Sequence, residues 1–382
     1  MGFGAIIATG DSNQPLPDDL AGAIAEARVE LPLDGPAQFA VRFIDDLRDG
    51  RPLIADDPRL AIGTLVSVLV EVDGALVCLV RGPITDHRSR MMLGGPGTSF
   101  DVIGLDRLDL LDRACVRRRW TGRASEAAQT ILSGTFDQVD VEETPRVYED
   151  RSATLNQRVT DLDFLQQIAQ RNNLHLWVSY EASRAALTGA ITVTETANLI
   201  SSPRRPEGAA GLLAGAISLI PTSEIELRVQ VPNEQNVTEF EISIDSRRPS
   251  QFEGGSMPWS DANPVTTRAS DPQPAAGGGA IRLAQLGGTP RELCMVGSGD
   301  PTETQSRAEA ALTEAGWFVR ATASTSMHLL GGVLRPHDVV RAVGVGPQLG
   351  ETAFRVRSAT HVITAAHHMI DAELDANALG AS

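Results

Sequence analysis

Cysteine is scarce in this sequence, which has only Cys78, Cys115 and Cys294 among its 382 residues. An odd number of widely separated cysteines argues against a disulfide framework and gives no paired spacing for a zinc site. Each of the three has apolar neighbours in the sequence, and we therefore expect all of them to be small residues of the core.

Long apolar runs are also missing. No stretch approaches the roughly 18 consecutive apolar residues that cross a membrane as a helix, so we expect no membrane insertion. The N-terminal segment 1–10 is apolar but short and has no basic flank, which is typical of an N-terminal strand or a frayed end and not of a signal peptide. These features predict a protein that is assembled in the cytoplasm.

The sequence lacks the motifs of common enzyme classes. It has no G-x-S-x-G nucleophile elbow, no H-E-x-x-H and no P-loop. Gly94–Gly97 lacks the Lys-Ser/Thr of a phosphate loop and predicts a tight turn. Gly344–Gly350 contains a G-x-G, but no capped helix follows it, as a dinucleotide site would require.

Acidic residues are plentiful but do not define a site. Adjacent residues of a strand point to opposite faces, so neighbouring carboxylates predict solvated loop charge and no shared acid–base pair. The pairs in question are Asp45-Asp46, Asp56-Asp57 and Glu142-Glu143. We expect no catalytic residues, no cofactor and a protein that is not an enzyme.

His361, His367 and His368 form the only histidine cluster of the sequence. On a strand, His361 and His367 would share a face and His368 would not. A metal site needs its ligands to converge and a further ligand beside them. We therefore expect surface or barrel-rim histidines and no metal site.

Positive charge is in deficit, with 33 Lys and Arg against 49 Asp and Glu, a net charge of −16 and a pI near 4.9. Duplex nucleic acid would repel this net charge, so we expect no specific nucleic-acid binding. Arg117–Arg119, followed by Trp120, is a local basic run without further aromatic residues. It predicts a solvated helix end or an ion-pair site between subunits.

Residues 1–104 alternate as β-strands do. Phe39, Val41 and Phe43 share one face, which is the pattern of a half-buried strand. A valine-rich run over residues 63–72 ends at Asp73-Gly74, a strong signal for a type I′ hairpin turn. We interpret 1–104 as a first small antiparallel barrel.

Residues 105–211 have a mixed pattern. Asp106–Arg119 has helical spacing, and Ser125 could cap a helix over Glu126–Leu132. The clearest helix is Asp161–Asn172, with Thr160 as N-cap and Asp163 three residues later. Leu174–Tyr180 then alternates as a strand. These patterns predict a mixed α/β domain.

Residues 212–382 predict a second barrel, built from about 212–245 and 317–375. The stretch 246–280 carries five prolines and three consecutive glycines, so we expect a long loop without regular pairing. A helix over 302–315 follows, with Thr302 as its cap. The predicted fold class is therefore mainly β, with two small antiparallel barrels joined by a mixed α/β section.

Three segments, in this order, resemble one family. The first resembles the opening of phage late control protein D and related baseplate hubs. The second resembles a helix–strand unit of those hubs and of VgrG spike proteins, and the third resembles their C-terminal barrel strands. The segments are Leu79–Thr85 with Asp101–Asp106, Leu155–Leu165 with Leu174–Val178, and Gly331–Asp338 with Thr352–His361 and Met369–Leu379. Asn172-Asn173 stands where this family usually has glycine.

The resemblance implies a structural baseplate hub of a contractile tail or injection system. It implies a homotrimer whose six barrels adapt a three-fold central spike to a hexameric tail tube. The implied partners are the spike, the tube protein and its initiator, and other baseplate proteins. A tail-associated cell-wall hydrolase and a type VI-like spike effector are the alternatives, and phage, tailocin and extracellular injection systems all remain open.

Overall fold

The computed structural model describes residues 4–45, 54–92, 97–149, 154–202, 225–256, 265–270, 281–286, 289–294, 300–347, 349–350 and 352–380. The predicted domain boundary between 211 and 212 lies outside these residues. None of the helices in this described part is long and apolar enough to cross a membrane.

The first third of the chain forms strands, as its alternation predicts. Its elements are β1 (Ile6–Thr9), β2 (Gln14–Pro15), α1 (Asp18–Ala21), β3 (Ile24–Leu31), β4 (Gln38–Ile44), the short 3₁₀ helix η1 (Pro58–Leu60), β5 (Leu65–Val72), β6 (Ala75–Arg90) and β7 (Ser99–Leu105). Phe39, Val41 and Phe43 of β4 are buried, which confirms the predicted core face. Asp73 and Gly74 have φ of 49° and 80°, as a type I′ turn between β5 and β6 requires.

The middle section is mixed, as predicted. It comprises the 3₁₀ helix η2 (Arg107–Asp112), β8 (Arg118–Trp120), β9 (Gly122–Arg123), α2 (Ala124–Leu132), β10 (Gln138–Val141), β11 (Val147–Tyr148), β12 (Leu155–Gln157), α3 (Asp161–Asn172), β13 (His175–Arg184) and β14 (Ile191–Ile200). The cap of α3 is confirmed, because Thr160 accepts the Asp163 N–H at 3.1 Å. Ser125 does not cap α2, which begins at Ala124, two residues before the predicted start, with Arg123 as N-cap.

The helix expected over 106–119 is wrong beyond Asp112. Val116 N–H donates to the Val159 carbonyl, and Cys115 forms a β-bridge with Thr160. This pairing draws the chain into β8, which runs antiparallel to β12. Arg118 and Arg119 therefore lie on a strand and not at a helix end, and Cys115 is exposed instead of buried.

The last section contains β15 (Glu226–Arg228), β16 (Glu239–Ile244), β17 (Pro249–Ser256), β18 (Val265–Ser270), the 3₁₀ helix η3 (Leu283–Leu286), β19 (Thr289–Cys294), α5 (Pro301–Gly316), β20 (Val319–Ser326), α6 (Met327–Leu330), β21 (Val339–Val343), β22 (Ala353–Ile363) and β23 (His368–Ala376). The stretch 246–280 is not free of pairing, because β17 pairs with β18 and β19. Pro249 opens β17, and the other prolines of that stretch lie outside the described residues.

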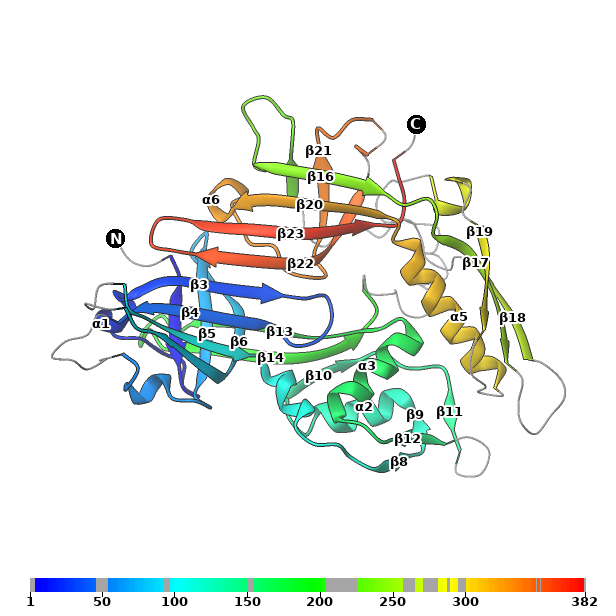
Figure 1. Ribbon diagram of the computed structural model, residues 1–382, viewed down its shortest axis with the longest axis horizontal. Helices are drawn as coiled ribbons and strands as arrows, with labels where there is room; N and C mark the ends of the chain where they lie inside the picture. The colour runs from blue at the N-terminus through cyan, green and yellow to red at the C-terminus, as the bar shows by residue number, and fades with distance from the viewer. Residues whose placement is uncertain are drawn as a thin grey trace.

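The strands β17–β19 and the helix α5 form a module inserted between β16 and β20, which lies at one side of the molecule (Figure 1). Phe252, Ala269, Ala308 and Leu312 pack together as its core. The helix is capped by Asp300, which accepts the Thr302 and Glu303 N–H groups, and not by Thr302 as predicted.

The described residues do not form the two separate closed barrels that we expected. Strands β22 and β3 pair antiparallel, from Ala359 opposite Leu31 to Ile363 opposite Ala27. This pairing joins both ends of the chain in one sheet, whose order in the described residues is β16-β20-β23-β22-β3-β4-β7-β6-β5-β1-β2 (Figure 1). The local alternation of each strand gives no information about such a pairing between segments far apart in the sequence.

Two units of this sheet have the same topology. We call β3 to β7 the first unit, and β16 with β20 to β23 the second unit. Numbered by their order along the chain, the strands of each unit lie in the spatial order 1-2-5-4-3, and all neighbours run antiparallel. In each unit, the pairing between the fourth and fifth strands also has a register shift at the same position, at Thr85 in β6 and at Arg357 in β22.

Candidate interaction site at the junction of the three sections

A buried ion pair lies at the centre of the junction. Arg355 of β22 donates from Nε to Oδ1 of Asp375 at 2.9 Å and from Nη2 to Oδ2 at 2.8 Å. Their side chains are 1% and 0% exposed. Trp317 covers the guanidinium, with its ring centre 4.0 Å from the Arg355 Cζ. The two-point geometry and the aromatic cover compensate for the loss of water around both charges.

His175 connects this pair to the rest of the chain. Its Nε2 lies 3.3 Å from Nη1 of Arg355, and its Nδ1 lies 2.8 Å from Oδ2 of Asp34. Because arginine only donates, Nε2 is the acceptor and Nδ1 carries the proton that His175 donates to Asp34. Asp34 belongs to the β3–β4 connection, His175 opens β13 and Arg355 lies in β22. One chain of hydrogen bonds thus joins all three sections.

His337 lies in a turn and packs against the same junction. Residues Arg335–Asp338 form a β-turn in which Pro336 precedes His337, whose φ is 74°. Glycine is the usual residue at that position of a type II turn. The ring of His337 stacks on Trp177 with centroids 3.6 Å apart, and its Nδ1 lies 2.7 Å from the Ser202 hydroxyl. Burial lowers the pKa of His337 well below its usual value, so the ring is neutral.

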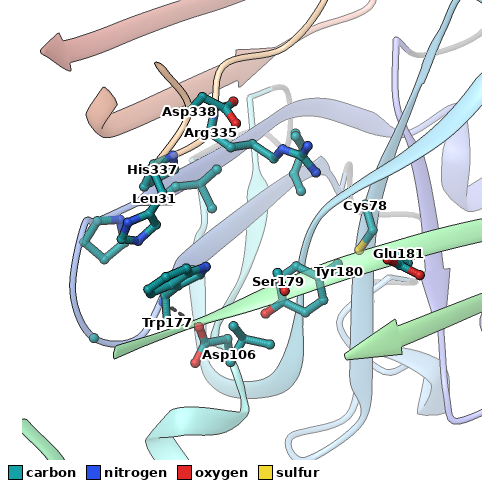
Figure 2. Close-up of a pocket in the computed structure, with 16 residues that line it drawn as sticks. Leu31, Cys78, Asp106, Trp177, Ser179, Tyr180, Glu181, Arg335, His337 and Asp338 are labelled. Atoms are coloured by element: carbon teal, nitrogen blue, oxygen red, sulfur yellow. Dashed lines mark hydrogen bonds between the residues drawn. The ribbon is translucent and has the colours of Figure 1, made fainter. Parts of the chain in front are cut away.

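A pocket of about 350 Å³ opens beside this turn (Figure 2). One wall is β13 from Trp177 to Glu181, and the opposite wall is the turn Arg335–Asp338. The Arg335 side chain points across the pocket (Figure 2).

Asp106 lies at the base of this pocket. Burial raises the pKa of its carboxyl to about 7, although the carboxyl accepts hydrogen bonds from the Ala37 and Leu108 N–H groups. Burial also raises the pKa of the Cys78 thiol, which makes it a poor nucleophile at neutral pH.

The histidine cluster is divided differently from the expectation. His361 and His368 are buried and face each other across the β22–β23 hairpin, with Nδ1 of His361 2.9 Å from Nε2 of His368, while His367 is exposed. The prediction of surface histidines is therefore wrong for two of the three. Within the described ranges, no group of three or more His, Cys, Asp or Glu side chains could hold a metal ion.

The adjacent carboxylates do not meet in one site. Asp45 is buried and not solvated as expected, because it accepts the Ile54 and Ala55 N–H groups. Asp46 lies outside the described residues. Asp57 caps η1, and Glu142 accepts the hydroxyl of Ser201.

Comparison with known proteins finds structures with the same fold but no relative by sequence. No family model matches the sequence, and no curated protein matches it. A tail protein of Neisseria meningitidis MC58 superposes with a TM-score of 0.61 at 13% identity, over 98% of this chain and 96% of that one. The 43 kDa tail protein of prophage MuSo2 from Shewanella oneidensis gives 0.60 at 13% identity, over 97% of both chains.

A type VI secretion system component of E. coli gives a TM-score of 0.51 at 10% identity, over 92% of this chain and 73% of that one. The chain thus has, across nearly its whole length, the fold of these two tail proteins and of the type VI secretion system component. This result confirms, at the level of fold, the resemblance to tail-hub proteins that the three segments indicated.

Proposed function

We propose that the chain is a structural hub in the baseplate of a contractile tail or injection system. Three copies form a closed ring that seats a central spike on one side and the hexameric tail tube, with its initiator, on the other. Other baseplate proteins bind around it. The protein catalyses no reaction, and it is assembled in the bacterial cytoplasm before it becomes part of the particle.

The shared topology of the two sheet units carries this proposal. A ring of three chains with one unit each can offer only three equivalent contacts. Because each chain has two units with the same strand order, three chains offer six similar units while the ring remains three-fold. This property is what an adaptor between a three-fold spike and a six-fold tube requires. The whole-length likeness to tail proteins supports the same function.

The two faces of the sheet suit a channel wall. On one face, Glu241, Thr322 and Glu373 form a row across β16, β20 and β23, and all three are exposed. The other face of the same strands is apolar, with Ala323 and Ala372 buried in the core. In the proposed ring, the polar and mainly acidic face lines the channel, where its charge disfavours adhesion of nucleic acid.

The molar mass of the purified protein in solution tests this proposal. Light scattering should give three times the mass of the 40.6 kDa chain for the protein alone, or that mass plus the mass of the bound spike after addition of the cognate spike protein. A mass of one chain under both conditions would contradict the proposed ring. A zymogram on cell walls should show no clearing, and lysis by the purified protein would contradict the structural role.

A further inference from the structure

Several strand edges of the sheet have no partner among the described residues, and two of these edges belong to β16 and β6. Strand β16 pairs only with β20, so its other edge is open. Strand β6 pairs with β5 up to Pro83, but beyond Ile84 its ladder continues only with β7. The end of β6, Asp86–Arg90, therefore has one open edge too. Open edges of this kind are sites where another strand can add.

We infer that the end of β6 in one copy pairs antiparallel with β16 of the next copy, and that two arginines and two glutamates select this pairing. The inference rests on the proposed ring and names the residues that close it. Its template is the contact that β22 and β3 make inside the chain. In the shared topology, β22 is the fourth strand of its unit, as β6 is, and β3 is the first strand, as β16 is.

The template also gives the register. When the register shifts at Thr85 and Arg357 are aligned, Arg90 of β6 is equivalent to Val362 of β22. The cross-strand pairs that lead from β3 through β4 to β7 match those that lead from β16 through β20 to β23. This match makes Glu241 of β16 equivalent to Arg28 of β3. Since Val362 lies opposite Arg28, Arg90 of one copy lies opposite Glu241 of the next. The full set of opposed pairs is His87 with Ile244, Arg88 with Ser243, Ser89 with Ile242, Arg90 with Glu241, and Met91 with Phe240.

The side chains in this register are complementary, although their chemistry played no part in deriving it. We call the proposed contact between β6 of one copy and β16 of the next the seam. Met91 is 66% exposed and Ile244 is 45% exposed in the single chain. Both side chains lie on the apolar face of the seam, where Met91 is opposite Phe240. A shift of one residue would move each apolar side chain of β16 to the polar face. The agreement between register and chemistry is the strongest support for the seam.

The charges on the edges of β6 and β16 favour the proposed pairing over a pairing of two identical edges. Arg88 and Arg90 lie on the polar face of β6, and Glu239 and Glu241 lie on the polar face of β16. No ion pair in the described part of the chain uses any of these four side chains. Directly opposed and diagonal pairs of opposite charge stabilise a sheet, and like charges opposite each other destabilise it. Each edge thus attracts the other edge and repels a second copy of itself, which favours a ring over a face-to-face dimer.

Charge reversal tests the selection. The variants R88E/R90E and E239R/E241R should each lose the trimer at concentrations where the unmodified chain is trimeric, and the fourfold variant that carries both pairs should regain it. Circular dichroism establishes that each variant is folded. Glu71 is exposed on β5, away from both edges, and E71R is the matched control that should remain trimeric.

Disulfide trapping tests the register. In a background in which the exposed Cys115 is serine, the pair S89C and I242C should give covalent trimers on oxidation, because directly opposed residues have adjacent Cβ atoms. The pair S89C and S243C, whose side chains lie on opposite faces, should not. A trimer that forms no S89C–I242C disulfide and survives both charge reversals would overturn the seam and leave the ring intact. A monomeric parent chain would overturn the ring and the seam together.

Discussion

Arg355 and Asp375 form a two-point ion pair that is almost fully buried, and Nη1 of Arg320 also reaches Oδ2 of Asp375 at 3.3 Å. Nη1 of Arg355 reaches the Ser202 carbonyl at 2.9 Å as well as His175, and Trp317 covers its face. The pair holds the end of β14 and the start of β13 against β22 and β23. The relative placement of the middle section and the second unit therefore depends on it.

Removing one partner of this pair should be costly. The variant D375N leaves the Arg355 guanidinium buried without its carboxylate, and we expect a loss of about 3 kcal/mol in the free energy of unfolding. Urea denaturation measures it. The double variant R355M/D375L should lose less than D375N alone, because both members of the fully buried pair are gone and Arg320, which also contacts Asp375, is 29% exposed and keeps access to water. The matched control R28M removes the half-exposed pair with Glu30 and should change stability by less than about 1 kcal/mol. Equal losses for D375N and R28M would contradict the role of the buried pair.

His337 and Trp177 give a prediction that separates backbone strain from stacking. H337A keeps a side chain at a φ of 74° and removes the stack, whereas H337G removes the stack and relieves the backbone. We therefore expect H337A to be less stable than H337G by about 1 kcal/mol. Thermal unfolding monitored by circular dichroism measures the difference. If H337G were the less stable variant, the positive φ would not be a source of strain at this turn.

The local parts of this fold could be predicted from sequence because local patterns determine them. The alternation in β4, the Asp73-Gly74 turn and the Thr160 cap each involve residues a few positions apart, and all three are present. The β17–β18 pairing was missed because prolines were counted over a whole stretch, while the strands lie between them. The expected helix over 106–119 failed because pairing with the segment before α3 outweighs leucine spacing.

The junction could not be predicted because its members are distant in the sequence. Asp34, His175 and Arg355 have no motif in common, and only the folded sheet brings them together. One local signal was available for His337, since Pro336 before it and Asp338 after it indicate a turn in which glycine is usual. The burial of His361 and His368 was missed because the parity argument placed all three histidines on one strand, whereas Thr364–His367 is the turn that lets both histidines face inward.

The buried pair of His361 and His368 predicts loss of stability in acid. Burial lowers their pKa values to about 3 and about 4 from an ordinary value near 6.5. Between pH 6.5 and 4 the unfolded chain therefore binds protons that the folded chain does not, so stability falls as the pH falls. At pH 5 the loss is about 2 kcal/mol for each histidine relative to pH 7.5.

The variant H361N/H368N tests the source of this loss. Urea midpoints measured between pH 7.5 and pH 5 should fall less steeply for H361N/H368N than for the unmodified chain. H367N changes the exposed histidine of the same hairpin and should leave the slope as it was. An unchanged slope in H361N/H368N would assign the acid sensitivity to other groups.

The polar face of β23 gives a prediction about the working particle. Asp371 and Glu373 are exposed on this face, away from the open edges of β16 and β6. If the face lines the channel, D371K/E373K should leave the trimer and particle assembly unchanged, because neither side chain lies at a subunit contact of the proposed ring. Ejection should slow, since polyanionic or acidic cargo would then adhere to the wall. E71K, on β5, is the matched control. Ejection kinetics that stay the same in D371K/E373K particles would place this face outside the channel, whereas particles that fail to assemble would place it at a contact with the tube or the spike.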